Sequence, residues 1–488
     1  MKGIITSLIF LFALITIQAQ PSQRPITGER WESLLCAPGD GPQPVPLNQV
    51  LDAVAERFGI KYKLNTDTAG YMVNYAASRF RPYSVEETLH NILVPLDLKA
   101  WDLGKGTWRI KAYEYPRRYD EEGRKMVDYL NSLYSNLDEW QPRSEVLRQE
   151  VRQRLGIDTL LNRCVDHQPI LSKPRKYDGY TVQNIALELM PGYYVCGSIY
   201  APSNTVARKT VAQRSGGKGE RYPLIICPIG HWADGRYNRD LQVRYATLAR
   251  MGCICITYDL YGWGESELQV GLDAHRTAFA HLYQALCGVR LLDYALTRKD
   301  VDPERVATNG GSGGGTHAVL LAVIDRRVKA CCAVVSVCSH FDGGCPCESG
   351  MPIQYSQGGT CNIELAATLA PMPLMVVGDE GDWTHTYPTI EVPYLKRIYG
   401  FYGAEDQVQH RFLPGEKHDF NANKRQAVYD FFTHVWSLPI GQQDESKATI
   451  ESYDKLFCFG GKQNADGQWI PTGETAPENF VRVSVEAQ

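Results

Sequence analysis

The sequence has no marked excess of charge of either sign. Its 51 Lys and Arg residues nearly balance 55 Asp and Glu residues, which gives a formal net charge of -4 over 488 residues. Nucleic acids and anionic membranes normally attract proteins that carry a strongly basic patch. The composition gives no reason to expect either partner, and a small or neutral substrate is expected instead.

Long apolar runs are absent after the first 20 residues, and a membrane-spanning helix needs about 20 consecutive apolar residues. We therefore expect no membrane span in the mature chain. The start, MKGIITSLIFLFALITIQAQ, has one lysine, an apolar run from Ile4 to Ile17 and Ala19 at a cleavage edge. This predicts a signal peptide over residues 1–19 and a periplasmic or secreted protein, with an uncleaved anchor helix as the alternative.

Residues 45–113 have the pattern of a small α+β module. PLNQVLDAVAERFGI and SVEETLHNILVPL both place apolar residues at helical spacing, and short β-like pieces such as IKYKL and TWRIKA lie around them. Residues 117–160 are charged and carry apolar residues on helical faces, which predicts a helical connector that packs against the domain that follows.

Residues 161–440 alternate short apolar runs with helical stretches, as in YPLIICPIG, CICITYDLYGWGES and PMPLMVVGDEGD. Continuous apolar strands separated by helices are typical of a parallel sheet that is buried on both faces. We therefore predict an α/β domain with a doubly wound, mostly parallel sheet. Residues 441–488 show no strong periodicity and are expected to form a C-terminal tail on its surface.

The stretch VATNGGSGGGTHAVL contains a candidate nucleophile, Ser312. Residues 310–314 fit the G-x-S-x-G pattern of a nucleophile elbow, in which a serine lies on a sharp turn between a strand and a helix. Small flanking residues are required there because the backbone of the serine is strained. The apolar runs on both sides favour strand, turn and helix over a flexible linker.

A serine hydroxyl needs a base and an orienting carboxylate, in the chain order Ser, Asp, His for this type of sheet. His418 and Asp382 each follow an apolar run, and loops at the carboxyl ends of strands are where such a sheet places its site. Asp382 ranks above its neighbours Asp379 and Glu380. Further alternatives for the acid are Asp342 and Glu348, after the preceding strand.

Two backbone N–H groups are needed to stabilise the oxyanion of an acyl-transfer reaction. Gly313, directly after the serine, is the first expected donor, and His231 or Trp232, in the loop after PLIICPI, is the second. The side chains of Trp232 and Trp383 are predicted to line the substrate site. Asp259 and Glu265 in YDLYGWGESE are expected to stabilise a turn rather than to act in catalysis.

The 14 cysteines are compatible with export. Five of them lie in apolar runs and are expected to be small buried side chains, namely Cys227, Cys253, Cys255, Cys331 and Cys332. Cys345 and Cys347 form one Cys-x-Cys pair, whereas a tetrahedral zinc site needs four ligands. No metal and no organic cofactor are therefore expected. A disulfide from either cysteine to a distant one, with Cys361 as a candidate, is the interpretation favoured here.

Four stretches, GGSGGGT, FDGGCPCESG, APMPLMVVGDEGDWT and KHDFNANKRQAVYDF, together resemble the acetyl xylan esterase-like branch of the α/β-hydrolase superfamily. This resemblance implies a serine carboxylesterase, often one that removes acetyl groups from plant polysaccharides. The chain departs from the branch at Ser349 and Gly350, where Asn-Ala is more usual. Gly313 replaces the arginine of typical glucuronoyl esterases, so that activity is not expected.

Residues 45–113 resemble the STN module (secretin and TonB N-terminus) of envelope proteins, which implies binding to another envelope component. Two other functions remain open at this point. The same triad could serve a peptidase or lipase, or the chain could be a non-catalytic envelope binding protein that uses the hydrolase fold only as a scaffold.

Overall fold

The computed structural model describes residues 45–482 apart from 66–67, 74–83, 94–95, 97, 113–119, 204–220, 233, 341–342, 344, 350–352, 466 and 468. The chain divides into two compact units, residues 1–113 and residues 114–488. The predicted signal peptide, residues 1–19, lies outside the described residues. Among the helices of the described part, none is both long enough and apolar enough to cross a membrane.

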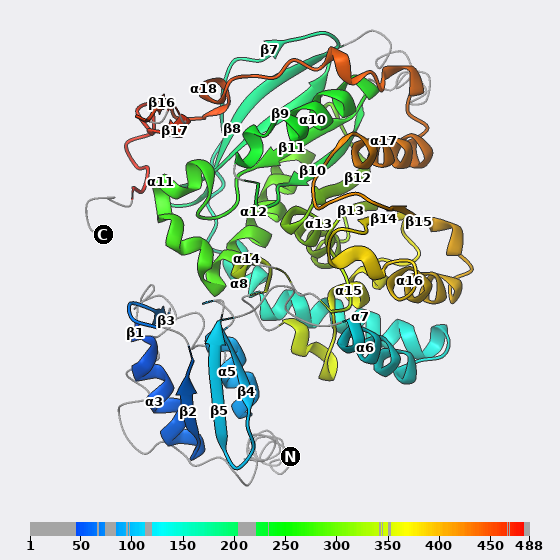
Figure 1. The fold of residues 1–488 in the computed structure, drawn as a ribbon. Coiled ribbons are helices and arrows are strands. Elements are labelled where there is room, and N and C mark those ends of the chain that lie inside the picture. The colour runs from blue at the N-terminus through cyan, green and yellow to red at the C-terminus, as the bar shows by residue number, and fades with distance from the viewer. Residues whose placement is uncertain are drawn as a thin grey trace, which may run out of the picture. The chain divides into compact units, whose positions relative to one another are not determined.

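The described residues of the N-terminal unit form a three-stranded sheet, a separate strand pair and two helices (Figure 1). Its elements are β1 (Val45–Pro46), α3 (Leu47–Phe58), β2 (Lys61–Leu64), β3 (Met72–Val73), α5 (Val85–Leu93), β4 (Leu98–Asp102) and β5 (Thr107–Ala112). Strand β5 lies in the middle of the sheet, parallel to β2 and antiparallel to β4. Apolar residues of both helices and of the sheet, such as Val50, Leu89 and Ile110, share one core.

The larger unit is built on a ten-stranded sheet in the order β15-β14-β13-β12-β10-β11-β9-β8-β6, with β7 paired to β8. Its strands are β6 (Ile170–Leu171), β7 (Arg175–Lys176), β8 (Tyr180–Met190), β9 (Tyr193–Pro202), β10 (Tyr222–Pro228), β11 (Ile254–Tyr258), β12 (Val301–Gly311), β13 (Ala330–Val334), β14 (Leu374–Asp379) and β15 (Val408–Leu413). The six strands from β10 to β15 are parallel, and β8 and β9 are antiparallel additions. The predicted mostly parallel sheet is confirmed.

Helices cover both faces of this sheet. The longer ones are α10 (Arg239–Met251), α12 (Ala278–Thr297), α13 (Gly313–Ile324), α16 (Glu391–Gly400) and α17 (Ala422–Trp436). Ile225 and Cys227 of β10 share a core with α10 and α17, which contact each other. The alternate residues Leu224 and Ile226 are also fully buried, on the opposite face, where α12 and α13 contact β10. The five cysteines predicted to be buried are all buried.

Shorter helices and 3-10 turns connect these elements. They are η2 (Gly235–Tyr237), η3 (Gly264–Ser266), α11 (Glu267–Val270), η4 (Leu272–Arg276), α14 (Pro346–Ser349), η5 (Ile353–Gly358), α15 (Asn362–Ala367), η6 (Trp383–Thr386), η7 (Glu405–Gln407), η8 (Ile440–Gln442) and η9 (Glu445–Lys447). Of these, η6 follows β14 and carries Trp383 of the candidate active site, and η4 lies after β11 and carries His275, which lies near Cys345 and Cys347.

The connector forms α6 (Asp120–Leu133), α7 (Leu137–Arg154) and α8 (Ile157–Leu161). Arg143 of α7 contacts the buried carboxylate of Glu364 through two hydrogen bonds of 2.6 and 3.0 Å. Arg148 donates to the carbonyls of Thr368 and Ala322, the latter at the end of α13. The connector therefore packs against the larger domain, as predicted.

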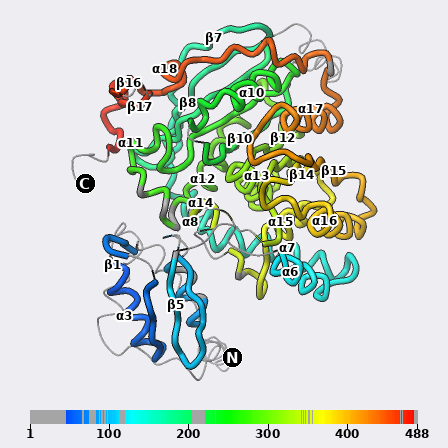
Figure 2. The backbone as a smooth tube through the Cα atoms, in the orientation of Figure 1, coloured from blue at the N-terminus to red at the C-terminus, as the bar shows by residue number. Residues whose placement is uncertain are grey.

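The segment after α17 returns to the antiparallel edge of the sheet (Figure 2). It contains α18 (Tyr453–Leu456) and the strand pair β16 (Gly461–Gln463) and β17 (Trp469–Pro471). Asn184 of β8 donates to the carbonyls of Lys455 and Phe457, and the Phe457 side chain belongs to the core under α10. This segment is therefore part of the core and not only a surface tail.

Candidate active site

Ser312 lies between the end of β12 and the start of α13, in the strand-turn-helix context that the sequence predicted. Its backbone has φ 55 and ψ -130, a conformation that is rare for a residue with a side chain. The first turn of α13 follows directly, so its N–H groups are directed toward the serine. This is the geometry of a nucleophile elbow.

The glycines around Ser312 are required by close approach of the backbone. A β-carbon at Gly310 would lie 2.1 Å from the carbonyl oxygen of Gly314. One at Gly314 would lie 2.4 Å from the carbonyl oxygen of Pro228, at the end of β10. Because these contacts are with backbone atoms, a side chain could fit only if the turn moved.

Three of the predicted site residues are joined by hydrogen bonds. Nε2 of His418 lies 2.9 Å from Oγ of Ser312, and its Nδ1 lies 2.7 Å from Oδ2 of Asp382. The carboxylate of Asp382 is buried and also accepts from the backbone N–H and the hydroxyl of Thr384. With a proton on Nδ1 shared with the carboxylate, Nε2 directs its lone pair toward Oγ of Ser312.

The other acids considered from the sequence have different surroundings. Asp379 forms an ion pair with the buried Lys424 at 3.0 Å, and burial raises the pKa of its carboxyl. Glu380 accepts from the backbone N–H of Gly415. Glu348 has a carboxylate oxygen 3.7 Å from Nδ1 of His231, and Asp342 lies outside the described residues. Of the described carboxylates among these candidates, that of Asp382 is the one hydrogen-bonded to His418.

The two predicted tryptophans both pack beside His418, Trp232 stacked and Trp383 tilted. The ring centroid of Trp383 lies 4.5 Å from that of His418, and its indole N–H donates to the carbonyl of Ser336 at 2.6 Å. Trp232 lies on the loop after β10, and its ring centroid is 5.8 Å from that of His418. Both aromatic rings therefore border the imidazole that faces Ser312.

The loop after β10 lies directly against the elbow. A β-carbon at Gly230 would be 2.5 Å from the carbonyl oxygen of Gly311, and one at Gly313 would be 2.7 Å from Cε1 of His231. The loop that carries His231 and Trp232 is thus close enough to Ser312 to supply a second N–H donor. Any side chain at position 313 would require the His231 ring to move.

Asp259 and Glu265, which were predicted to stabilise a turn, are both buried, and Asp259 accepts from the backbone N–H of Glu265 at 3.1 Å. Both pair with the fully buried Arg236, at 2.9 and 2.7 Å. Glu265 also accepts from the backbone N–H groups of Cys458 and Phe459. Burial raises the pKa of Glu265 to about 7, and the Asp259 carboxylate adds to this while Arg236 opposes it.

The predicted disulfide is wrong. Cys345, Cys347 and Cys361 are free thiols, and Cys361 is buried at the start of α15. Cys345 and Cys347 lie instead beside the rings of His231 and His275. Two thiols alone supply too few ligands for a metal, but the fold adds two imidazoles. His275 had no signal in the sequence, because it lies 70 positions from Cys345.

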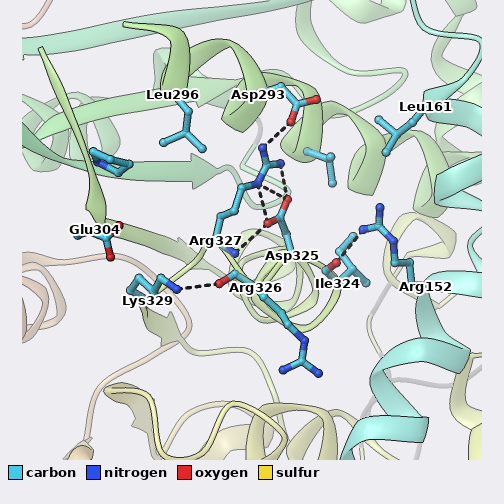
Figure 3. Close-up of a pocket in the computed structure, with 12 residues that line it drawn as sticks. Arg152, Leu161, Asp293, Leu296, Glu304, Ile324, Asp325, Arg326, Arg327 and Lys329 are labelled. Atoms are coloured by element: carbon cyan, nitrogen blue, oxygen red, sulfur yellow. Dashed lines mark hydrogen bonds and ion pairs between the residues drawn. The ribbon is translucent and has the colours of Figure 1, made fainter. Parts of the chain in front are cut away.

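A hollow of about 590 Å³ lies on the surface between α7 and α12 (Figure 3). Charged side chains line it, and these pair with one another: Arg327 contacts both Asp325 and Asp293. Arg152 donates to the carbonyl of Ile324. None of the three triad candidates lines it, so it is not part of the candidate active site.

Comparison with known proteins agrees with this architecture. The solved structure of methylesterase BT1017 is 55% identical to the chain, covers 90% of it and 94% of the other chain, and superposes with a TM-score of 0.70. The acetyl xylan esterase (AXE1) family model matches residues 268–346. Fold and comparisons define a carboxylic ester hydrolase of the α/β-hydrolase fold. The chain belongs to the same family as methylesterase BT1017.

Two less similar proteins were also matched. Acetyl esterase Axe7A of Xylanibacter ruminicola is 28% identical over 135 residues, which are 24% of this chain and 30% of that protein. The chain thus aligns with less than a third of the length of this curated relative. A glucuronoyl esterase from Solibacter usitatus is 15% identical, covers 62% of this chain and 94% of the other, and has a TM-score of 0.41.

Proposed function

We propose that the chain is an exported serine carboxylesterase that acts on carbohydrate esters. Ser312 attacks the ester carbonyl, His418 accepts its proton and passes it to the leaving alcohol, and Asp382 orients the imidazole and stabilises its charged form. Water then attacks the acyl-enzyme with the help of the same histidine. The observation that carries the proposal is the continuous pair of hydrogen bonds from Ser312 through His418 to Asp382.

The negative charge of the tetrahedral intermediate needs two donors close to Ser312. We assign them to the backbone N–H of Gly313 and to that of His231 or Trp232. This assignment is supported by the close contact between the Gly230 loop and the elbow. Trp232 and Trp383 would then form the walls beside the ester group, since the rings of both lie next to that of His418.

Two kinds of carbohydrate ester are candidates. The sequence resemblance favours an acetyl ester of a xylan-type sugar, in which the sugar is the leaving alcohol. The 55% identity to a methylesterase favours a methyl ester of a sugar acid, in which methanol leaves. The same triad serves both, because only the position of the sugar relative to the carbonyl differs.

Product analysis separates these candidates. Purified enzyme is incubated with acetylated xylan and with a methyl-esterified polyuronide, and acetate and methanol are measured. We expect release of one of them and a loss of at least about 10³-fold in kcat for Ser312→Ala. Cleavage of peptides or long-chain lipids alone would favour the peptidase or lipase alternative. Failure of Ser312 to react with a fluorophosphonate would favour a non-catalytic binding protein.

Export and the role of the N-terminal unit belong to the same proposal. Mass spectrometry of the chain recovered from its natural host should show a mature start after Ala19. The α+β arrangement of residues 45–112 supports an STN-like module that binds another envelope component. Crosslinking in intact cells, with a variant that lacks residues 45–112 as control, tests for that partner.

A further inference from the structure

Four side chains outside the triad converge on one point. The ligand atoms of His231, His275, Cys345 and Cys347 all lie within 4.8 Å of one another. His231 comes from the loop after β10, His275 from η4, and the two cysteines from the start of α14. Cys347 and His275 are buried, and the other two are partly buried. Three segments far apart in the sequence thus meet at two imidazoles and two thiols.

The distances within this group fit a metal ion at its centre. Nε2 of His231 lies 3.0 Å from Nε2 of His275 and 3.1 Å from Sγ of Cys347. Zinc bonds of about 2.0–2.1 Å to nitrogen and about 2.3 Å to sulfur give tetrahedron edges of about 3.3 and 3.6 Å. The observed separations are only a few tenths of an ångström shorter than these edges.

The outer contacts of the histidines also fit metal ligands. Nδ1 of His275 lies 2.6 Å from the carbonyl oxygen of Tyr261, which fixes a proton on Nδ1 and leaves a lone pair on Nε2. That lone pair faces Nε2 of His231 at 3.0 Å, inside the group of four side chains. Nδ1 of His231 lies 3.7 Å from a carboxylate oxygen of Glu348, which is too far for a hydrogen bond but places a negative charge beside the ring.

We propose that His231, His275, Cys345 and Cys347 form a binding site for a zinc-class divalent cation. Two imidazoles and two thiolates are ligands that zinc prefers, and binding would release the two thiol protons to solvent. Four protein ligands fill a tetrahedral ion and leave no open position, so the site is structural. It does not depend on the esterase activity proposed above.

The site has a direct structural consequence for the elbow. The His231 ring lies against Gly313, the first residue of α13, where any β-carbon would be 2.7 Å away. A metal ion that holds His231 would therefore fix the loop after β10 against the start of α13. It would also tie this loop to η4 and α14.

Metal analysis of the purified full-length protein tests the site. We expect about one zinc per chain by inductively coupled plasma mass spectrometry, and the characteristic visible bands of tetrahedral cobalt after exchange with Co²⁺. A Cys345→Ser, Cys347→Ser double variant should lose both signals. Cys361→Ser, which removes a buried thiol outside the group, and Ser312→Ala should keep them. No stoichiometric metal in wild-type protein incubated with Zn²⁺ would overturn the proposal.

A second measurement uses wild-type protein alone, in case the double variant does not fold. Titration with a mercurial thiol reagent should release zinc to a coloured chelator as the first thiols react. Removal of zinc by a strong chelator should lower Tm, and added Zn²⁺ should restore it. Retention of the zinc after all accessible thiols have reacted, or a Tm unchanged by chelation, would show that these cysteines do not hold a metal.

Discussion

The ammonium group of Lys424 lies 3.0 Å from the carboxylate of Asp379, and both side chains are fully buried. Asp379 is the last residue of β14, three positions before Asp382. Lys424 also contacts Asp419, beside His418. Through Lys424, the loop after β14, which carries Asp382, is tied to the loop after β15, which carries His418.

Substitutions of the two aspartates should have different effects. Asp382→Asn should lower kcat by about 10⁴-fold with little change in Tm, because the imidazole loses its orienting carboxylate. Asp379→Asn should destabilise the fold by about 3 kcal/mol, because it leaves the buried Lys424 charge with one partner fewer. Kinetics and urea denaturation of both variants check this. The opposite pattern, with Asp379→Asn the more damaging to kcat, would mean that Asp382 is not the triad acid.

The tight backbone contacts at the elbow predict a cost for the smallest side chain. Gly314→Ala should destabilise the protein by about 1–3 kcal/mol and reduce activity, because the new methyl group would lie 2.4 Å from the carbonyl oxygen of Pro228. Gly441→Ala is the matched control, since no atom lies within 4 Å of the β-carbon position there. Equal Tm values for the two variants would show that the loop after β10 can move away from the elbow.

Glu265 predicts a specific dependence of stability on pH. Its pKa is raised to about 7 by burial and by Asp259, whereas an unfolded glutamate titrates near about 4.3. Between these pH values the native state holds a proton that the unfolded state has lost. The free energy of unfolding should therefore fall as the pH rises through this range, and level off above about pH 7.

Urea denaturation at about pH 5 and about pH 8 measures this dependence. Glu265→Gln cannot titrate and should show a smaller difference in unfolding free energy between the two conditions than wild type. Glu304→Gln removes an exposed carboxylate and is the control. A Glu265→Gln variant with the same pH dependence of unfolding free energy as wild type would contradict a raised pKa at Glu265.

The elbow and the order of Ser312, Asp382 and His418 could be predicted because each depends on a local pattern: an apolar strand, a sharp turn and a polar residue at the strand end. The pairing of Asp379 with Lys424 could not, because Lys424 lies on a helix 45 positions later and its partner is set by the packing of α17 on the sheet. The same limit explains the error on the cysteines. A Cys-x-Cys pair is visible in the sequence, but the contact of Cys347 with His231 arises only when the loops after two strands meet.

The contact of Phe457 and Lys455 with β8 has a consequence for synthesis of the chain. The N–H groups of Cys458 and Phe459 complete the bonding of Glu265, which lies almost 200 positions earlier. Until this segment has left the ribosome, the buried carboxyl group of Glu265 lacks two of its donors and one edge of the core is open. The larger domain should therefore reach its final packing only after residues 455–459 have been translated. A nascent chain that stalls before them is expected to bind chaperones.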